Sequence, residues 1–253
     1  GHAAGAAPAL PPLERSYIDF AAWHVAQADS AQMQAQMRYW LARLADAPEP
    51  LALPEDLPRP AVATGRGGSE FVRIEAALAE RLRELAARSN ATLFMTLLSA
   101  YFLFLHRTTG QRDLVIGLPM RSQAAERLQQ VMGFFVNVLP LRLQLDPAWT
   151  FRELLGRVRE ALLDCFAHPD VPLERLVQAL ELPRDLSRSP VYQALFSMDD
   201  SREQQREWGA LRCEDMVLPH YSALTDLSMW VDEDDERLLL DLNYSADIIS
   251  APS

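Results

Sequence analysis

The residues best suited to acid–base chemistry in this sequence are its five histidines, and their spacing forms no catalytic or metal-binding motif. They are His2, His24, His106, His168 and His220. No two are close in sequence, and neither His-Glu-x-x-His nor His-x-His occurs. We therefore expect a structural or surface role for each of them.

Signatures of nucleophiles and of bound metals are absent as well. The sequence has no Gly-x-Ser-x-Gly. Its two cysteines, Cys165 and Cys213, are too few for a disulfide framework and wrongly spaced for a metal site. Cys165 lies in a helical pattern and is expected to be a small buried apolar residue. The glycines of residues 65–68 lack the Lys-Ser/Thr of a phosphate loop and predict a flexible turn. Residue chemistry alone thus predicts no active site, catalytic or metal-binding.

One polar residue stands inside an apolar run, at the start of a predicted strand. Asn137 follows Gly133, two phenylalanines and Val136. A buried amide must find hydrogen-bond partners, and two interpretations remain open. Asn137 either fixes a turn or faces a substrate channel.

Composition argues against two classes of partner. The 24 basic and 35 acidic residues give a net charge of −11. Nucleic-acid binding needs clustered Lys and Arg to neutralise phosphates, and an anionic membrane surface would repel such a chain. No apolar run reaches the roughly 18–20 residues of a membrane span, and the first residues lack the regions of a secretory signal. The low cysteine content favours a reducing compartment, so we expect a cytoplasmic location.

The N-terminal quarter of the chain is expected to form a linker and a crossover segment rather than part of a hydrophobic core. Residues 1–13 are rich in Ala and Pro and read as a linker or tag remnant. Residues 16–44 form an amphipathic helical pattern. Five prolines between residues 48 and 60 forbid a helix interior there, so this stretch is expected to cross a surface in extended form. We assign residues 14–66 to a crossover helix with its proline-rich segment.

From residue 70 onward the pattern alternates between strands and helices. Thr92 and Gly110 are placed to begin and end an apolar, buried helix, and Thr150 with Glu153 matches a capping box. Pro140 lies in a strand with period-two alternation, which places that strand at an edge or a bulge. The pattern predicts an α/β fold, a two-layer sandwich with a mixed β-sheet and flanking helices. The expected helices span residues 77–89, 92–105, 150–167 and 173–180. The expected strands span residues 70–74, 114–118, 139–145, 191–197, 226–231 and 237–243, with a turn at 232–235.

Seven motifs, in order, resemble those of the condensation domains of nonribosomal peptide synthetases. One is Gly133-Phe134-Phe135-Val136-Asn137-Val138 through Arg142, which is similar to Gly-x-Phe-Val-Asn-Thr-x-x-x-Arg with Val138 in place of Thr. The others are Arg38-Tyr39-Trp40 with Leu53-Pro54-x-Asp56-x-Pro58-Arg59-Pro60, Ala91-Thr92-Leu93-Phe94-Met95, Asp113-Leu114-Val115-Ile116-Gly117-Leu118-Pro119, His168-Pro169-Asp170-Val171-Pro172-Leu173-Glu174, Arg188-Ser189-Pro190-Val191-Tyr192-Gln193, and Leu242 to Ile248 with Tyr244 and Asp247.

The resemblance implies one lobe of a chloramphenicol-acetyltransferase-like fold, with residues 67–253 as the C-terminal, acceptor-side lobe. In the family, two lobes enclose a tunnel, and a carrier-bound acyl donor is joined to a carrier-bound amine. The family's His-His-x-x-x-Asp-Gly belongs to the other lobe and is absent from this sequence. We therefore expect no catalytic residue here and no condensation by this chain alone. His168 and Asp170 are expected to hold a helix end.

By resemblance, four residues are candidates to line the tunnel: Asn137, Phe135, Ser197 and Met198. If the opposite strand face looks inward, the candidates shift by one residue, to Val136 or Ser197. No cofactor is expected to bind directly, and the phosphopantetheine arm of a carrier protein is expected to bring the substrate. The expected partners are a peptidyl carrier protein, an adenylation domain and the N-terminal condensation lobe.

Two alternatives remain open. One is a non-catalytic module that docks carrier or adenylation domains. The other is half of a related epimerisation, cyclisation or acyltransferase domain. An isolated lobe is expected to expose a large apolar surface and to associate with itself or with its missing partner.

Overall fold

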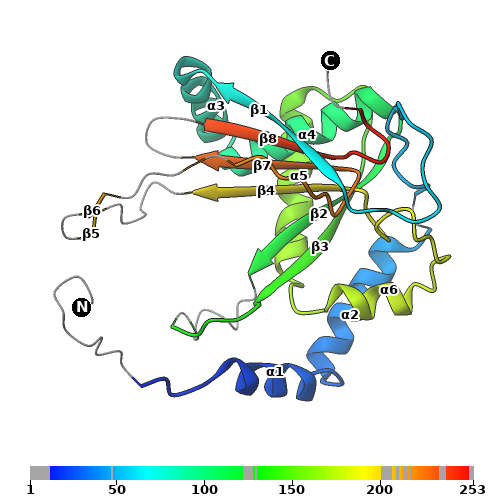
Figure 1. Ribbon diagram of the computed structural model, residues 1–253, viewed down its shortest axis with the longest axis vertical. Helices are drawn as coiled ribbons and strands as arrows, with labels where there is room; N and C mark the ends of the chain where they lie inside the picture. The colour runs from blue at the N-terminus through cyan, green and yellow to red at the C-terminus, as the bar shows by residue number, and fades with distance from the viewer. Residues whose placement is uncertain are drawn as a thin grey trace.

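A six-stranded mixed sheet forms the centre of the computed structural model (Figure 1). The structure describes residues 12–46, 48–121, 128, 130–200, 207–208, 211–212, 216, 218–233 and 238–250. The spatial order of the strands is β1-β8-β7-β4-β2-β3. β4 runs parallel to β2 and to β7, and the other neighbours are antiparallel. The strands are β1 (Gly67–Ile74), β2 (Asp113–Arg121), β3 (Val136–Gln144), β4 (Ala194–Asp200), β7 (Leu227–Glu233) and β8 (Leu238–Ser245).

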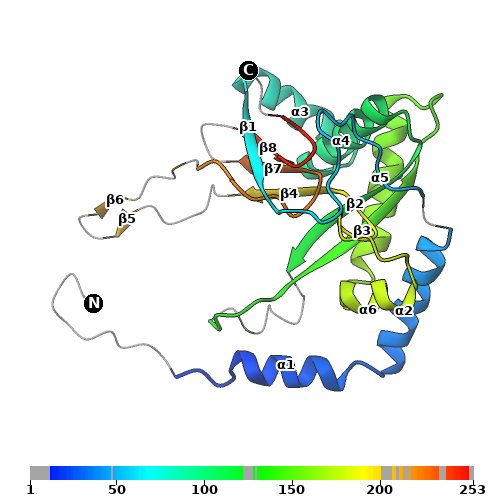
Figure 2. The same ribbon diagram turned by 45° about the vertical axis from the view of Figure 1, so that its right-hand side comes forward.

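Three helices cover one face of this sheet and confirm the predicted sandwich (Figures 1 and 2). They are α3 (Ala76–Arg88), α4 (Leu93–Thr109) and α5 (Phe151–Phe166). The ring of Phe196, on β4, contacts the rings of Phe94 and Tyr101 on α4. Of the described helices, no single one has the length and hydropathy of a membrane span, whereas α3 and α4 pass that test together across a 103° bend.

The predicted helix signals are confirmed by the caps. The Thr92 hydroxyl accepts a hydrogen bond from the Met95 backbone, and Gly110 ends α4 with φ +73°, a conformation that favours glycine. Thr150 and Glu153 form the predicted capping box of α5. The observed caps agree with the predicted ones, so side-chain and backbone contacts within a few residues determine where these helices begin and end.

The amphipathic segment of residues 16–44 is two helices rather than one. They are α1 (Tyr17–Ala26) and α2 (Ala31–Leu44). Ser16 begins α1 with a capping box, and the Ser30 hydroxyl accepts from the Met33 backbone to begin α2. This second cap lets the chain turn between the two helices, and α2 then packs beside α6 (Leu173–Ala179).

Other sequence predictions are confirmed or corrected in the sheet. Pro140 lies in β3, an edge strand, where its missing N–H does least harm. Residues 191–193 do not extend β4, because Val191 has φ +68° and forms a turn. Residues 232–233 belong to β7 rather than to the predicted turn, and residues 234–237 lie outside the described part. The two-stranded sheet of β5 (Glu207–Trp208) and β6 (Leu211–Arg212) was not predicted, since each strand is only two residues long.

Candidate functional site

Asn137 uses its amide to join two elements. Its Nδ2 donates to the backbone oxygens of Pro169 (3.0 Å) and Val171 (2.8 Å), and its Oδ1 accepts from the Leu173 backbone (3.3 Å). These atoms belong to the segment between α5 and α6 and to the first residue of α6. The contacts agree with the interpretation that Asn137 fixes a turn. The second interpretation, that Asn137 faces a substrate channel, stays a prediction.

Phe135 directly precedes β3 and packs against α1. It is 6% exposed and packs edge-on against Phe20 and Tyr17. The Tyr17 hydroxyl also donates to the Phe134 backbone oxygen. A Cβ at Gly133 would collide with the Tyr17 ring, so this contact requires glycine there. Phe135 thus anchors α1 to the segment that leads into the sheet.

Ser197 and Met198 point to opposite faces of the sheet because consecutive strand residues alternate. Phe196 faces α4, so Met198 also faces the helices, and it packs on the core. Ser197 faces the other side, where it is paired with Trp230 of β7. No described helix covers this second face (Figures 1 and 2), which we call the open face. By the same alternation Val136 lies on the open face and Asn137 on the helix-covered one.

A polar cluster on the open face has no counterpart among the sequence predictions. Nδ1 of His220 lies 2.9 Å from Oδ2 of Asp241, and Ser69 Oγ donates to the same carboxylate oxygen (3.4 Å). The other oxygen of Asp241, Oδ1, is buried and has no hydrogen-bond partner. The Ser69 hydroxyl accepts from the backbone of His220 rather than bonding its ring, so this is not an activated serine. The three residues are far apart in sequence, and no motif signals their meeting.

His168 and Asp170 lie between α5 and α6 and contact α2. Nδ1 of His168 lies 2.8 Å from the Asp164 backbone oxygen, and its ring stacks on Tyr39 with the ring centroids 3.7 Å apart. Oδ2 of Asp170 accepts from Gln36 (2.8 Å), whose Oε1 accepts from the Asp170 backbone. His168 and Asp170 therefore join the end of α5 to α2, and the contact of His168 with Asp164 agrees with the expectation that they hold a helix end. His2 and Cys213 lie outside the described residues.

The described residues offer no metal centre and no reactive thiol. Within them, no group of three His, Cys, Asp or Glu side chains could hold a metal ion. Burial raises the pKa of the Cys165 thiol to about 12, which keeps it protonated at neutral pH. Among the described residues, the open face carries the hydrogen-bonding groups of Ser69, His220 and Asp241 beside the apolar Trp230.

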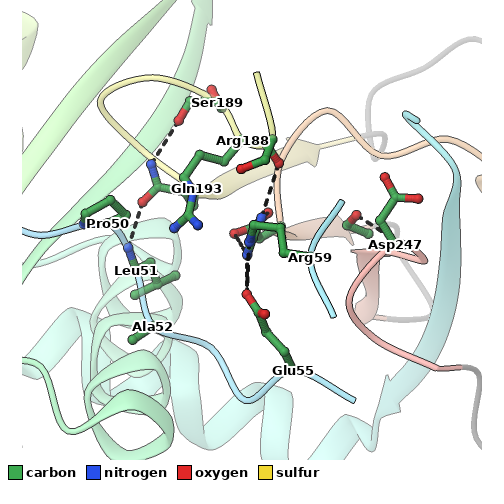
Figure 3. Close-up of polar contacts among 12 residues, drawn as sticks. Pro50, Leu51, Ala52, Glu55, Arg59, Arg188, Ser189, Gln193 and Asp247 are labelled. Carbon is green, nitrogen blue, oxygen red and sulfur yellow. Dashed lines mark hydrogen bonds and ion pairs between the residues drawn. The ribbon is translucent and has the colours of Figure 1, made fainter. Parts of the chain in front are cut away.

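Several motif residues fasten the crossover segment, residues 48–66, to the sheet (Figure 3). The Leu51 backbone donates to Oε1 of Gln193 (2.7 Å), and Nε2 of Gln193 donates to the Ser189 backbone oxygen (2.9 Å). Further along, Thr64 donates to Asp247 through both its backbone N–H and its hydroxyl. The contacts of Leu51 and Thr64 each link residues more than 140 positions apart.

Two arginines complete the attachment. Arg59 donates to both carboxylate oxygens of Asp226 at 2.8–2.9 Å, and its Nε donates to Glu55. Arg142, the last residue of the motif around Asn137, pairs with Asp113 at 2.6 Å and donates to backbone oxygens of residues 43, 45 and 46. Burial raises the pKa of Asp113, but hydrogen bonds from Arg142 and Gln144 outweigh it and leave that pKa lowered. Arg59 and Arg142 thus each join segments that are far apart in the sequence.

Comparison with known families and proteins agrees with the motifs. A model of the condensation domain matches residues 2–251. The chain is 41% identical over 204 residues to the phosphinothricin tripeptide synthetase PhsC of Streptomyces viridochromogenes, covering 80% of this chain and 19% of that protein. It is 35% identical over 242 residues to the malpibaldin synthetase of Mortierella alpina, covering 96% of this chain and 4% of that protein. The chain therefore spans a small part of these synthetases.

Solved structures confirm the predicted lobe fold. The X-domain from teicoplanin biosynthesis superposes with a TM-score of 0.86 and 30% identity, over 98% of this chain and 58% of that one. The same X-domain has also been solved in complex with OxyB. The first condensation domain of the CDA synthetase superposes with a TM-score of 0.77 and 23% identity, over 96% of this chain and 52% of that one. In each case the chain matches little more than half of the solved domain.

Proposed function

Because the chain belongs to the condensation-domain family, we propose that it forms the C-terminal, acceptor-side lobe of a condensation domain in a peptide synthetase. In the parent enzyme, the amine of a carrier-bound acceptor attacks the thioester of a carrier-bound acyl donor. An amide bond forms, and the donor carrier's thiol leaves. The sequence contains no His-His-x-x-x-Asp-Gly. General acid–base help from a positioned histidine contributes about 10²–10⁴-fold, so this chain alone is proposed to be inactive.

The observation that carries this proposal is an exposed apolar surface on α1 and the segment before β3. Ile18 and Val25 of α1 are 77% and 75% exposed, and Met132 and Phe134 are 94% and 74% exposed. Monomeric proteins seldom leave large apolar side chains together in water, and such surfaces mark interaction sites. We assign this surface, the α1 surface, to contact with the complementary lobe.

The open face is proposed as the wall of the substrate tunnel. It carries Ser197, Trp230, Val136 and the imidazole of His220, which is a mixture of apolar and hydrogen-bonding groups. A phosphopantetheine arm from a peptidyl carrier protein would bring the acceptor amine along it. The partners in this proposal are that carrier, an adenylation domain and the complementary lobe, in the cytoplasm.

Association with the complementary lobe tests the proposal. We would mix the chain with a separately produced lobe that carries His-His-x-x-x-Asp-Gly and measure complex formation by sedimentation velocity. A 1:1 complex is expected, and the double substitution Ile18→Asp with Phe134→Asp should abolish it. Leu186→Asp, at a residue 53% exposed and outside the α1 surface, should leave it intact. Absence of a complex for the unsubstituted chain would contradict the proposal.

A second function is favoured by one comparison. The TM-score and identity are higher against the teicoplanin X-domain than against the CDA condensation domain, and the X-domain is known in complex with OxyB. The chain would then serve as a docking module for another protein, without amide formation. An amide-forming assay on the complex of the two lobes separates the two functions.

A further inference from the structure

A cavity of about 410 Å³ lies beside the crossover segment, away from the open-face residues described above. Its walls come from residues 48–51, from the start of β2 and from the loop of residues 182–193. The apolar wall includes Pro50, Leu182, Pro183 and Pro190. This volume is in the range of small-molecule sites, which combine apolar walls with a few polar groups.

One of those polar groups, Arg188, has most of its hydrogen-bonding capacity unused. Its Nε lies 2.9 Å from Oδ2 of Asp185 as an ion pair but is buried without a directed hydrogen bond. Its two terminal nitrogens have no hydrogen-bond acceptor among the described residues. The side chain is 23% exposed, and it lines the cavity, as do Gln193 and Leu51 (Figure 3). A guanidinium whose terminal N–H groups are free matches a carboxylate in a two-pronged contact.

The backbone next to Arg188 is strained at the cavity wall. Val191 has φ +68°, and the Tyr192 N–H donates to the Pro190 oxygen at 2.8 Å, which closes a three-residue γ-turn. Such a turn is rare and strained, and more so for a β-branched residue. Strain of this kind persists only where the surroundings enforce it, and it is concentrated at binding sites. Here the turn separates Arg188 and Ser189, on the cavity wall, from Tyr192, which packs over Gly117.

The remaining charges of the cavity define the ligand. Asp113 is paired with Arg142 and Asp185 with Arg188. Glu49 also lines the cavity, and its carboxylate has no partner among the described side chains. The cavity therefore offers the terminal N–H groups of Arg188, the unpaired carboxylate of Glu49 and an apolar wall. A simple anion could pair only with Arg188, whereas a zwitterion could pair with both Arg188 and Glu49.

We propose that this cavity binds a free α-amino acid with an apolar side chain. The ligand carboxylate lies on the terminal N–H groups of Arg188, the ammonium is toward Glu49, and the side chain packs on the prolines and Leu182. This site is separate from the proposed substrate tunnel, and its occupancy does not depend on amide formation. It would allow the chain to respond to amino-acid concentration through the loop that also fastens the crossover segment by Gln193.

The test uses L-phenylalanine as the probe and the whole chain, with saturation-transfer NMR followed by titration. Saturable binding is expected. L-Phenylalaninamide, which lacks the carboxylate, and N-acetyl-L-phenylalanine, which lacks the ammonium, should each bind at least tenfold more weakly. Arg188→Gln should weaken L-phenylalanine binding at least tenfold. Arg184→Gln, at a nearby exposed arginine that does not line the cavity, should not change it.

Leu182→Trp keeps the test decisive if Arg188→Gln destabilises the fold. The larger side chain would fill the cavity from its loop and should also prevent binding, with an unchanged circular dichroism spectrum. No saturable binding by the unsubstituted chain, or equal binding of the amide and the free acid, would overturn the proposal. Neither readout involves carriers or amide formation, so such a failure would leave the proposed function untouched.

Discussion

Replacing Arg59 by methionine is expected to leave the Asp226 carboxylate buried without its counter-ion. The two side chains are 10% and 5% exposed, and two hydrogen bonds join them directly. Breaking a buried pair by removing one partner costs about 3–5 kcal/mol. Because Arg59 retains slight contact with solvent and Glu55 is only its secondary partner, we expect a loss of about 3 kcal/mol in the free energy of unfolding. Replacing both partners, as Arg59→Met with Asp226→Leu, should recover most of that loss.

Urea unfolding followed by tryptophan fluorescence measures these differences, and Trp40 is fully buried as a reporter. The matched control is Arg66→Gln. Arg66 is 73% exposed and lies 3.7 Å from Asp247, a surface pair worth about 0–1 kcal/mol. The reasoning is refuted if Arg59→Met costs no more than Arg66→Gln, or if the double substitution is as unstable as the single one.

Three further predictions follow from the same joints and the core. Asn137→Ala should lower the free energy of unfolding by about 2 kcal/mol, because it leaves backbone groups of residues 169–173 without partners; urea unfolding checks this, and an unchanged midpoint would contradict it. In a Cys213→Ser background, Cys165 should not react with a thiol reagent at pH 8 until the chain is unfolded, since burial raises its pKa to about 12; fast reaction of the folded chain would argue against that burial. The lowered pKa of Asp113 stabilises the fold at pH values above the ordinary carboxyl pKa of about 3.9, and this contribution is lost as the pH falls through the folded-state value. Asp113→Asn should therefore flatten the pH dependence of stability below about pH 4, and an unchanged slope would count against the Arg142 pairing.

The elements that local chemistry determines could be predicted from the sequence. Thr92, Gly110 and the Thr150–Glu153 box mark helix ends through contacts within a few residues. Pro140 predicted a strand at an edge or a bulge because its missing N–H excludes it from a regular central strand, and β3 is an edge strand. The break between α1 and α2 depends on Ser30, a cap hidden inside one continuous amphipathic pattern.

Contacts between distant residues could not be predicted in the same way. Nothing near Asp241 in the sequence indicates that His220 and Ser69 will meet it, and nothing near Gln193 indicates Leu51. The contact of Phe196 with Phe94 on α4 determines which faces Ser197 and Met198 occupy, and this contact is not evident in the sequence. The alternation of strand residues was evident from the sequence, but which face the helices cover depends on tertiary packing. The positive φ of Val191 likewise arises from its surroundings, since its own side chain opposes it.

The measurement that tests the account most directly is amide formation by the two lobes together. Carrier-bound donor and acceptor would be mixed with this chain, with a complementary lobe carrying His-His-x-x-x-Asp-Gly, and with both, and the product would be followed by mass spectrometry. We predict no enzyme-dependent product with either lobe alone and clear product with both. Amide formation by this chain alone, or none by an established complex of the two lobes, would contradict the assignment as the acceptor-side half of a condensation domain.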